Sequence, residues 1–566
     1  MGKPHVLVFP IPLQGHINPM MTLSRNLHNS GIEVTFLLTE RSLSRIYMSN
    51  TRMCNIHNNS SNSPQTTSYH MKEDSAIQKI ALNYELHHQH PSTNRTHLQY
   101  NISNKDEKTV IEVGNIFNNL CIHGERNHNS VRNDATLDGC IDAYTRHATP
   151  VIQFETLPDS VFPLDQSTSV SDSALIFLES MPLIRRKMEE ILESLQRKGH
   201  PVTCIISDSF VPWTQDVANK FGIPRIEFWS SSARVYSMGY HIPQLISEGY
   251  LPVPPGKEHD FCIDIIPGLA PFRLVDFFYT HPISSPVFDL VRNAFTRAKE
   301  ARRVLVNSFY EFEKDIIDGL HKEGILIEPI GPLIPYPTCR HRAMTTENGD
   351  KNMMMSMSLY ADDTDCLVWL DTQEKGSVIY VSFGSMVSLD REELQELILG
   401  LEGSELPYLL VVRPDMPFKE CKRTKGRGKI CSWAPQGQVL AHPAVSGFLT
   451  HCGWNSIMEG ICSGVPMIGC PRESEQHTNL KCLMDEWKVA IRLDHKEDSR
   501  VEPRHCKEPS ANRPRIQRGP VERAVRSLMQ EDVGAALRER MRTLQRSALL
   551  EARRKAAPLG SLVADL

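Results

Sequence analysis

The chain has 566 residues, of which 40% are hydrophobic and 23% are charged, and its formal net charge is −5 at pH 7. This length and this ordinary composition predict two or more globular domains, and the slight negative charge argues against a general nucleic-acid-binding protein. The 14 cysteines form no CxxC pair and show no zinc-ligand spacing. We therefore expect reduced thiols in a cytoplasmic protein, with no metal site.

The N-terminal residues predict a strand, a helix and a second strand. The first apolar run is short, is interrupted by prolines and has no small-residue cleavage site after it, so we interpret residues 5–10 as a buried strand rather than a secretory signal. Residues 20–31 predict a helix that ends at Gly31, and residues 33–39 predict the second strand. No run approaches the ~18–20 apolar residues of a transmembrane helix, so we expect no membrane insertion.

His16 lies in the loop just past the first predicted strand. Ligands of such βαβ units bind at the carboxyl ends of the strands, and a histidine there can take a proton near neutral pH. A loop or helix-capping role is the better interpretation for an arbitrary histidine among the 23 in the chain. The position alone therefore leaves both interpretations open.

Residues 54–149 interrupt the βαβ pattern. They are rich in Asn, His, Ser and Thr and lack apolar periodicity, so we expect a disordered insertion or an artefact of the coding sequence. Its histidines show no ligand spacing, and its glycosylation sequons at Asn58, Asn94 and Asn101 mean little without a secretory signal.

Alternation of helices and strands resumes after the insertion. Residues 173–199 predict a long amphipathic helix, and residues 201–210 predict a strand that carries Asp208 at its carboxyl end. Asp208 can reach the same crevice as His16 and fix the tautomer of the histidine, or it can merely cap the next helix. Residues 230–276 are proline-rich and predict loops.

The remaining segments complete two predicted domains. Residues 1–336 form an N-terminal domain, residues 337–365 a polar linker, residues 366–540 a C-terminal domain, and residues 541–566 a terminal helix and tail. In the C-terminal domain, a buried strand ends in Gly384 and Ser385, where backbone and hydroxyl can approach a phosphate. An ordinary strand-to-helix turn has the same pattern.

The polar residues of the C-terminal domain concentrate between residues 433 and 476. An apolar strand ends at His451, and a helix follows that we expect to be capped by Asn455 or Ser456 and ended by Gly464. The free N–H groups and the dipole of such a helix form an anion site, most often for phosphate. Each feature alone is more often structural, because such Asn-Ser pairs usually cap helices.

The flanks of this segment suit a nucleotide sugar. Trp433 precedes a proline, so its ring can stack on a base from a loop, although a loop Trp is more often a packing residue. Glu459 lies one helical turn after Asn455, where its carboxylate can accept hydrogen bonds from sugar hydroxyls. Glu475 and Gln476 follow the strand VPMIGCP and suit the vicinal hydroxyls of a hexose.

Taken together, the segments WAPQ, HPAV, THCGWNS and GVP, with the closing Glu475-Gln476, resemble the signature motif of plant family 1 UDP-glycosyltransferases. The pattern FPxPxQGHxNPM around His16 and the strand-SDxF pattern around Asp208 resemble the same family. This resemblance implies the GT-B fold, in which two Rossmann-like α/β domains face each other across a cleft. The N-terminal domain then binds the acceptor, and the C-terminal domain binds the UDP-sugar.

The resemblance also assigns roles to residues. It implies that His16 deprotonates the acceptor hydroxyl and that Asp208 orients His16. It further implies that uracil contacts Trp433, Ala434 and Gln436, that the diphosphate contacts His451, Asn455 and Ser456, that the ribose contacts Glu459, and that the sugar contacts Glu475 and Gln476. The candidate donor site also includes Gly384, Ser385, Gly453 and Trp454. The family more often has Asp where Glu475 stands, and Gln476 with Trp454 accompanies glucose as the donor sugar.

We therefore expect inverting, metal-independent transfer of a hexose, glucose, from UDP-glucose to a hydroxyl of a phenolic or terpenoid-like acceptor. We expect a monomer that needs no cofactor. One alternative is a catalytically impaired UDP-sugar-binding member of the family, because of the insertion in the N-terminal domain. Another is an NAD-dependent oxidoreductase, but neither first strand is followed by GxGxxG. The acceptor itself is not readable from the sequence.

Overall fold

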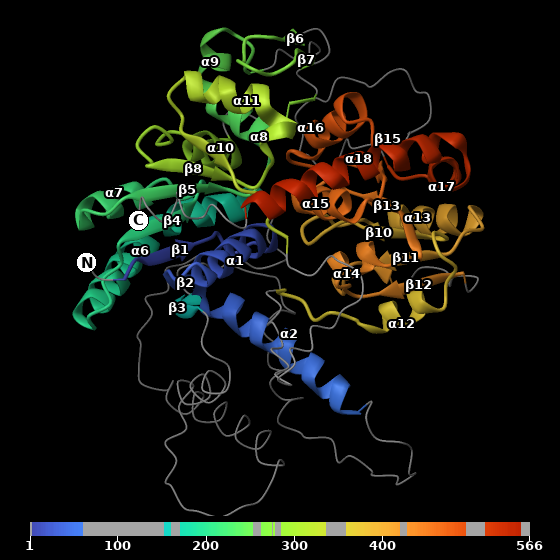
Figure 1. Ribbon diagram of the computed structural model, residues 1–566, viewed down its shortest axis with the longest axis horizontal. Helices are drawn as coiled ribbons and strands as arrows, with labels where there is room; N and C mark the ends of the chain where they lie inside the picture. Colours follow the sequence, from blue (N-terminus) through green and yellow to red (C-terminus); the bar gives the residue numbers. More distant parts are fainter. Residues whose placement is uncertain are drawn as a thin grey trace, which may run out of the picture. The chain divides into compact units, whose positions relative to one another are not determined.

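The computed structural model describes residues 3–59, 152–159, 170–252, 262–273, 276–277, 285–334, 358–418, 427–493 and 515–555. Most of the predicted insertion (60–149) and most of the predicted linker (337–357) lie outside these residues. The described residues form two open parallel sheets, each flanked by helices (Figure 1). The predicted fold class, two Rossmann-like α/β domains, is thereby confirmed.

The N-terminal sheet has seven parallel strands in the order β3-β2-β1-β4-β5-β8-β9. They are β1 (His5–Phe9), β2 (Glu33–Thr39), β3 (Gln153–Leu157), β4 (Cys204–Asp208), β5 (Arg225–Trp229), β8 (Arg303–Val306) and β9 (Ile327–Pro329). The chain winds outward from β1 to β3 and then returns to place β4 on the other side of β1. The direction of winding therefore reverses between β1 and β4, and ligands of open α/β sheets bind at such a switch point.

The helices of the first domain cover both faces of its sheet. They are α1 (Gln14–Asn29), α2 (Glu40–Asn59), α6 (Val170–Arg197), α7 (Thr214–Phe221), α8 (Ala233–Tyr240), α9 (Ile242–Ser247), α10 (Pro286–Ala294) and α11 (Tyr310–Lys322). Alternate side chains of β1 enter different cores. Val6 and Val8 pack with α1 and α2, whereas Leu7 and Phe9 pack with α6 and α7.

The C-terminal sheet has six parallel strands in the order β12-β11-β10-β13-β14-β15. They are β10 (Val378–Ser382), β11 (Tyr408–Val411), β12 (Gly428–Cys431), β13 (Val445–Thr450), β14 (Met467–Gly469) and β15 (Ala490–Arg492). Its helical segments are α12 (Asp365–Asp371), α13 (Arg391–Gly403), α14 (Gln436–Ala441), α15 (Trp454–Ser463), α16 (Gln476–Lys481), η4 (Cys482–Glu486), α17 (Arg518–Gln530) and α18 (Asp532–Lys555). Here the winding reverses between β10 and β13, so a second switch point lies there.

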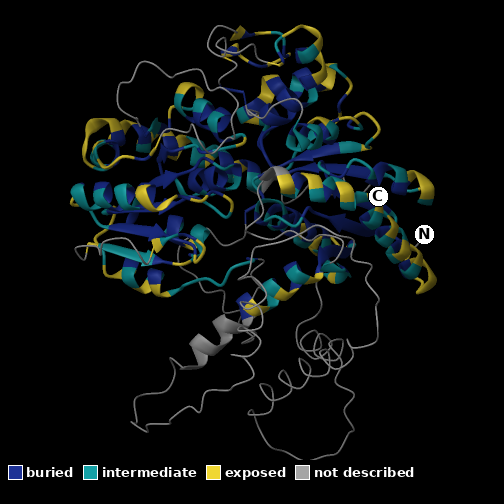
Figure 2. Cartoon of the chain, turned by 180° about the vertical axis from the view of Figure 1, so that it is seen from behind, coloured by how far each residue is buried: buried dark blue, intermediate teal, exposed yellow. Residues whose placement is uncertain are grey.

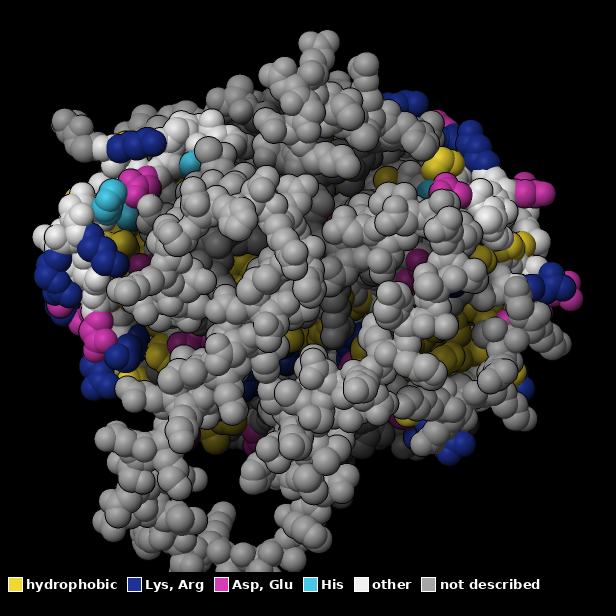
Figure 3. Space-filling model, turned by 90° about the horizontal axis from the view of Figure 1, so that it is seen from below, with side chains coloured by type: hydrophobic (Ala, Val, Ile, Leu, Met, Phe, Trp, Pro, Cys, Tyr) yellow, Lys and Arg dark blue, Asp and Glu magenta, His cyan; other side chains and the backbone are white. Residues whose placement is uncertain are grey.

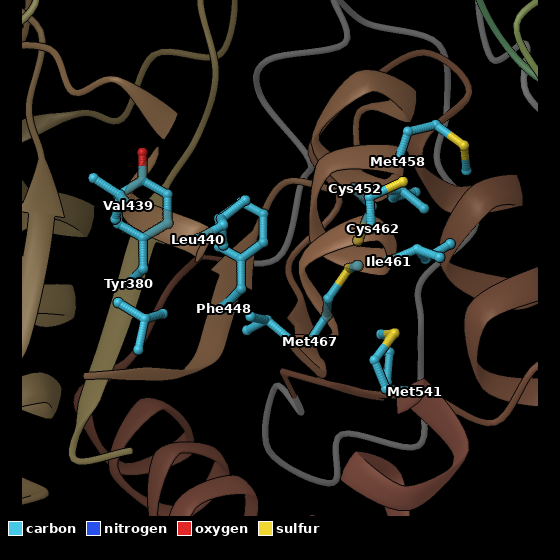
Figure 4. Close-up of a cluster of buried hydrophobic side chains, with 14 of the residues drawn as sticks. Tyr380, Val439, Leu440, Phe448, Cys452, Met458, Ile461, Cys462, Met467 and Met541 are labelled. Atoms are coloured by element: carbon cyan, nitrogen blue, oxygen red, sulfur yellow. The ribbon is translucent and has the colours of Figure 1, made fainter. Parts of the chain in front are cut away.

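The C-terminal sheet is also buried on both faces. Tyr380 of β10 and Phe448 of β13 stack with their ring centroids 5.1 Å apart, in the core shown in Figure 4. Ile379 and Val381 of β10 enter the opposite core with α13 and α17. Figure 2 shows the resulting pattern, with dark blue strands inside and exposed residues on the outer faces of the helices. The apolar runs of the sequence are thus explained by burial on two faces.

The structure corrects the prediction for residues 230–276, which contain α8, α9 and a hairpin of β6 (Cys262–Ile263) and β7 (Phe272–Arg273) rather than loops alone. The prolines of this region had suggested loops. Helix α8 nevertheless forms, because Ser232 caps it by accepting from the amide of Val235 and because its apolar residues pack into a separate core. The predicted domain boundary between residues 540 and 541 falls inside α18.

The described surface carries both signs of charge. Where described side chains are visible on the face in Figure 3, Lys and Arg residues alternate with Asp and Glu. Many are paired on helix surfaces, as in the ion pair between Lys187 and Glu190 of α6. None of the helices in the described parts of the chain combines the length and the apolar character needed to cross a bilayer.

Candidate active site

The first switch point brings His16 and Asp208 into direct contact. His16 lies in the first turn of α1, because this helix begins at Gln14 and not near residue 20 as the sequence predicted. Nδ1 of His16 lies 2.6 Å from Oδ2 of Asp208, whose side chain is only 1% exposed. Since the carboxylate accepts the Nδ1 proton, Nε2 of His16 carries the lone pair that can accept another proton.

Neighbouring groups fix this pair. The backbone N–H of Phe210 donates to Oδ1 of Asp208 at 3.0 Å. The hydroxyl of Ser230 lies 3.2 Å from Nδ1 of His16. The ring of Phe210 meets the imidazole ring edge-on, with the centroids 5.8 Å apart. The imidazole is therefore held by a carboxylate, a hydroxyl and an aromatic ring before any substrate binds.

The second switch point holds His451, which is 9% exposed, between two glycine-containing turns. A Cβ atom on Gly384 would lie 2.7 Å from the imidazole ring of His451, and one on Gly453 would lie 2.4 Å from it. Gly384 also has a φ of 71°, so glycine is required there for space and for conformation. Burial lowers the pKa of His451 to about 4, so this histidine is neutral near pH 7.

The side chain of Arg413 is hydrogen-bonded to the turn that follows β10. Its Nη1 donates to the carbonyl oxygens of Gly384 (2.9 Å) and Val387 (2.6 Å). Its Nε and Nη2 donate to the carboxylate of Asp415 at 3.0 Å and 2.8 Å. With two carbonyls turned toward this buried guanidinium, the turn that contains Ser385 is fixed in one conformation.

Three predicted donor-site residues form a hydrogen-bonded group. Nε2 of Gln436 donates to Oγ of Ser456 at 2.9 Å and to Oε2 of Glu459 at 2.6 Å. The hydroxyl of Tyr380 donates to Oε1 of Gln436 at 3.2 Å. Burial raises the pKa of Glu459 to about 7, so this carboxyl group titrates near neutral pH.

The two ends of the segment 433–476, at Trp433 and at Glu475, lie in connections between a strand and a helix. The ring of Trp433 stacks on that of Tyr360, with centroids 4.3 Å apart and an interplanar angle of 24°, and Ala434 beside it is buried. Gln476 begins α16, and its Oε1 accepts from the amides of Arg472 (2.8 Å) and Glu473 (3.1 Å). Glu475 precedes it as the N-cap residue, with no side-chain capping bond.

Trp454 and Asn455 reach the first domain. The predicted N-cap residues of α15 are wrong, because the helix begins at Trp454 and its N-cap is Gly453. The predicted C-terminal end is confirmed, since Gly464 ends the helix with a φ of 74°. Nε1 of Trp454 donates to the carbonyl of Asn307 at 2.7 Å, and Nδ2 of Asn455 donates to the carbonyl of Gly15 at 2.7 Å. Since Asn455 is one residue inside the helix, its side chain is available for this contact between domains.

Four residues of the site are not predicted from the sequence: Ser230, Asn307, Tyr360 and Arg413. Ser230 and Asn307 directly follow the carboxyl ends of β5 and β8. Position at the carboxyl end of a parallel strand is the signal that pointed to Asp208 at the end of β4, and it points to Ser230 and Asn307 as well. Tyr360 and Arg413 have no comparable signal, since their contacts depend on tertiary packing.

In the described part of the chain, no three His, Cys, Asp or Glu side chains are grouped so that they could hold a metal ion.

Comparison with known proteins gives one consistent family. The family model described as UDP-glucoronosyl and UDP-glucosyl transferase matches residues 353–502. The chain is 30% identical over 512 residues to (R)-mandelonitrile beta-glucosyltransferase of Prunus dulcis, which covers 87% of this chain and 86% of that protein. It is 28% identical over 565 residues to UDP-glycosyltransferase 85A1 of Arabidopsis thaliana, with coverage of 96% and 92%.

Solved structures agree in fold. Phytolacca americana UGT2, complexed with UDP-2fluoro-glucose and pterostilbene, aligns with a TM-score of 0.64 and 24% identity, over 99% of this chain and 100% of that chain. A Polygonum tinctorium UDP-glucosyltransferase capable of glucosylating indoxyl aligns with a TM-score of 0.65 and 24% identity, over 100% and 99% of the two chains. The GT-B fold expected from the sequence is confirmed.

Proposed function

This chain belongs to the plant family 1 UDP-glycosyltransferases, enzymes that transfer a glycosyl group from a UDP-sugar to a small acceptor, and we propose that it transfers glucose with inversion and without a metal ion. The observation that carries this proposal is the 2.6 Å contact between His16 and Asp208 at the first switch point. A single oriented base facing a single leaving group suits one in-line displacement at the anomeric carbon, and such a displacement inverts that carbon.

The proposed reaction begins at Nε2 of His16, which takes the proton of the acceptor hydroxyl. Asp208 keeps the other ring nitrogen protonated and stabilises the imidazolium that forms. The acceptor oxygen then attacks the anomeric carbon of glucose, and the bond from that carbon to the UDP oxygen breaks. The proton stays on His16 until the product leaves.

The leaving diphosphate requires stabilisation in this reaction. We assign this role to the turn of Gly384 and Ser385, to neutral His451 and to the N-terminus of α15, where Asn455 and Ser456 lie in the first turn. Backbone N–H groups and the helix dipole favour anions there, and in a partly buried site their fixed orientation stabilises charge without reorganisation. These groups supply the stabilisation that a metal ion provides in other transferases.

The remaining donor contacts follow the same assignment. Trp433 stacks on the uracil, and Ala434 and Gln436 contact its edge. Glu459 accepts from the ribose hydroxyls. Glu475 and Gln476, with Trp454 and Gly453 nearby, bind the glucose; because Oε1 of Gln476 already accepts two backbone amides, a sugar hydroxyl would meet its Nε2 group.

The proposed acceptor is a small lipophilic molecule with a hydroxyl group. Relatives named for (R)-mandelonitrile in Prunus dulcis and for 7-deoxyloganetin in Gardenia jasminoides support this class. The monomeric state and the cytoplasmic location stay predictions.

The test is UDP release from UDP-glucose by the full chain against a panel of phenols and terpenoid alcohols. The coupling constant of the anomeric proton in the product should identify a β-glucoside, and turnover should persist in EDTA. An α-glucoside would contradict inversion, and loss of turnover in EDTA would contradict metal independence. UDP-glucose binding without turnover of any acceptor would favour the catalytically impaired alternative.

A further inference from the structure

We infer that Asn455, oriented by Asn307, ties the diphosphate-binding turn of α15 to the turn that carries the catalytic base, and that Pro19 makes this tie by freeing the carbonyl of Gly15. The inference rests on the proposed function, because it assigns positioning residues to that reaction. It also adds a contact to the expectation for Asn455, whose side chain bonds to the first domain.

Pro19 lies inside α1, one turn after Gly15. In an α-helix, the N–H of each residue donates to the carbonyl four residues before it, so residue 19 would normally donate to Gly15. Proline has no N–H, and its ring presses against that carbonyl. The oxygen of Gly15 accepts instead from Nδ2 of Asn455, at 2.7 Å.

Asn307 decides which end of the Asn455 amide faces Gly15. Its own side chain is 1% exposed, and its Oδ1 accepts from the amide of Leu333 at 2.8 Å. Its Nδ2 therefore points away from Leu333 and donates to Oδ1 of Asn455 at 3.3 Å. With that oxygen occupied, the NH₂ group of Asn455 must face Gly15.

The three hydrogen bonds donate in the same direction, from the amide of Leu333 through Asn307 and Asn455 to the carbonyl of Gly15. Successive hydrogen bonds in such a chain polarise one another. The backbone carbonyl of Asn307 also accepts from the indole of Trp454 at 2.7 Å. Asn307 thus holds two consecutive residues in the first turn of α15.

The tie fixes two groups that must act together. Gly15 is the neighbour of His16, and Asn455 belongs to the helix end that we assign to the leaving diphosphate. The distance from base to leaving group is therefore set by side chains that need not contact substrate. Loss of the tie should lower kcat more than it raises the KM for UDP-glucose.

Pro19→Ala tests the inference most directly. The substitution restores an N–H that can donate to Gly15 and compete with Asn455. It also removes a proline from a helix interior, so the melting temperature should not fall. We expect kcat to fall about 10-fold, the worth of one hydrogen bond, with a change of less than about 2-fold in KM for UDP-glucose. Asn307→Asp, which retains the acceptor for Leu333 and removes the donor to Asn455, should act in the same direction.

The matched control is Glu486→Gln. Glu486 forms a contact of 2.6 Å with Nη2 of Arg234, which also joins the second domain to the first but includes neither α1 nor α15. If contacts between the domains act only by holding them together, Pro19→Ala and Glu486→Gln will have equal effects on kcat, and the inference is overturned.

Hydrogen exchange separates this inference from the proposed function. Wild-type turnover tests the function, whereas exchange tests the tie even if no acceptor is turned over. Peptides covering residues 453–458 should exchange faster in Pro19→Ala and Asn307→Asp than in Glu486→Gln. Unchanged exchange in Pro19→Ala, or a loss of kcat in Pro19→Ala that is accompanied by a lower melting temperature, would overturn the tie.

Discussion

The two halves of the site differ in how far they are prepared for the reaction. In the base half, His16 and Asp208 already contact each other, and Asp208 is almost fully buried. In the donor half, the predicted ligand groups contact one another, as Gln436 does with Ser456 and Glu459. The predicted base is thus preorganised, whereas the predicted donor-site groups would exchange protein partners for ligand atoms when a UDP-sugar binds. Changes in the first should appear in kcat, and changes in the second should appear in affinity.

The largest effect is expected from the base half. His16→Ala should lower kcat by about 10² to 10⁴, the usual contribution of a general base. Asp208→Asn should cost a large part of the same factor, because the amide does not hold the reactive tautomer. Steady-state kinetics with UDP-glucose and any accepted phenol would measure both.

UDP binding by calorimetry is the control for these variants. If the halves are separate, the affinity for UDP will be unchanged in His16→Ala. Weaker UDP binding in that variant would break the comparison and show that His16 also supports the donor site.

The next effect is expected at Trp433. Trp433→Ala should raise the dissociation constant of UDP-glucose about 5- to 100-fold, since stacking of a base on an aromatic side chain contributes about 1–3 kcal/mol. The rate at saturating donor should change little. Tyr360→Phe keeps the ring that stacks on Trp433 and serves as the matched control; an equal loss of affinity there would mean that the hydroxyl of Tyr360, and not stacking, matters.

A smaller effect is expected from Glu459, whose pKa burial raises from 4.5 to about 7. Between these values the unfolded chain loses the proton while the folded protein keeps it, so the free energy of unfolding falls as pH rises. Glu459→Gln removes this titration, so its stability relative to the wild type should rise between about pH 5 and about pH 7. Urea unfolding at several pH values measures this difference, and parallel curves for the two proteins would contradict it.

The same titration bears on donor binding. If the carboxylate of Glu459 accepts from ribose hydroxyls, the affinity for UDP-glucose should rise a few-fold as pH passes through about 7. Glu459→Gln should flatten this dependence. His451 does not interfere, because its pKa of about 4 leaves it neutral throughout this range. A pH dependence that persists in the variant would assign it to another group.

The smallest kinetic effect is expected away from both halves. Asp390 caps α13 by accepting from the amide of Glu393, whose side chain returns a bond to the amide of Asp390. Asp390→Ala should lower the free energy of unfolding by about 1 kcal/mol and leave kcat and KM unchanged. A kinetic effect in this variant would show that stability and activity are coupled in this chain.

The sequence predicted the central strands well because they are largely apolar runs buried on two faces, as in the segment that became β10. It also predicted the pairing of His16 with Asp208, since His16 follows β1, Asp208 ends β4, and both strands end at one edge of the sheet. It did not predict the start of α1, the helices after β5 or the role of Asn307. Those depend on packing between segments distant in sequence, where local patterns carry little information.

The winding of the two sheets has a further consequence. The turn after β10, which contains Gly384, occupies in its own sheet the place that the turn with His16 occupies after β1. The two sheets are thus wound alike, with the predicted base after the first strand of one and the predicted anion-binding turn after the first strand of the other. Apart from Asp208, the assigned groups follow the strands rather than lie on them. Exchange of turns between relatives should therefore alter substrate range while both scaffolds stay intact.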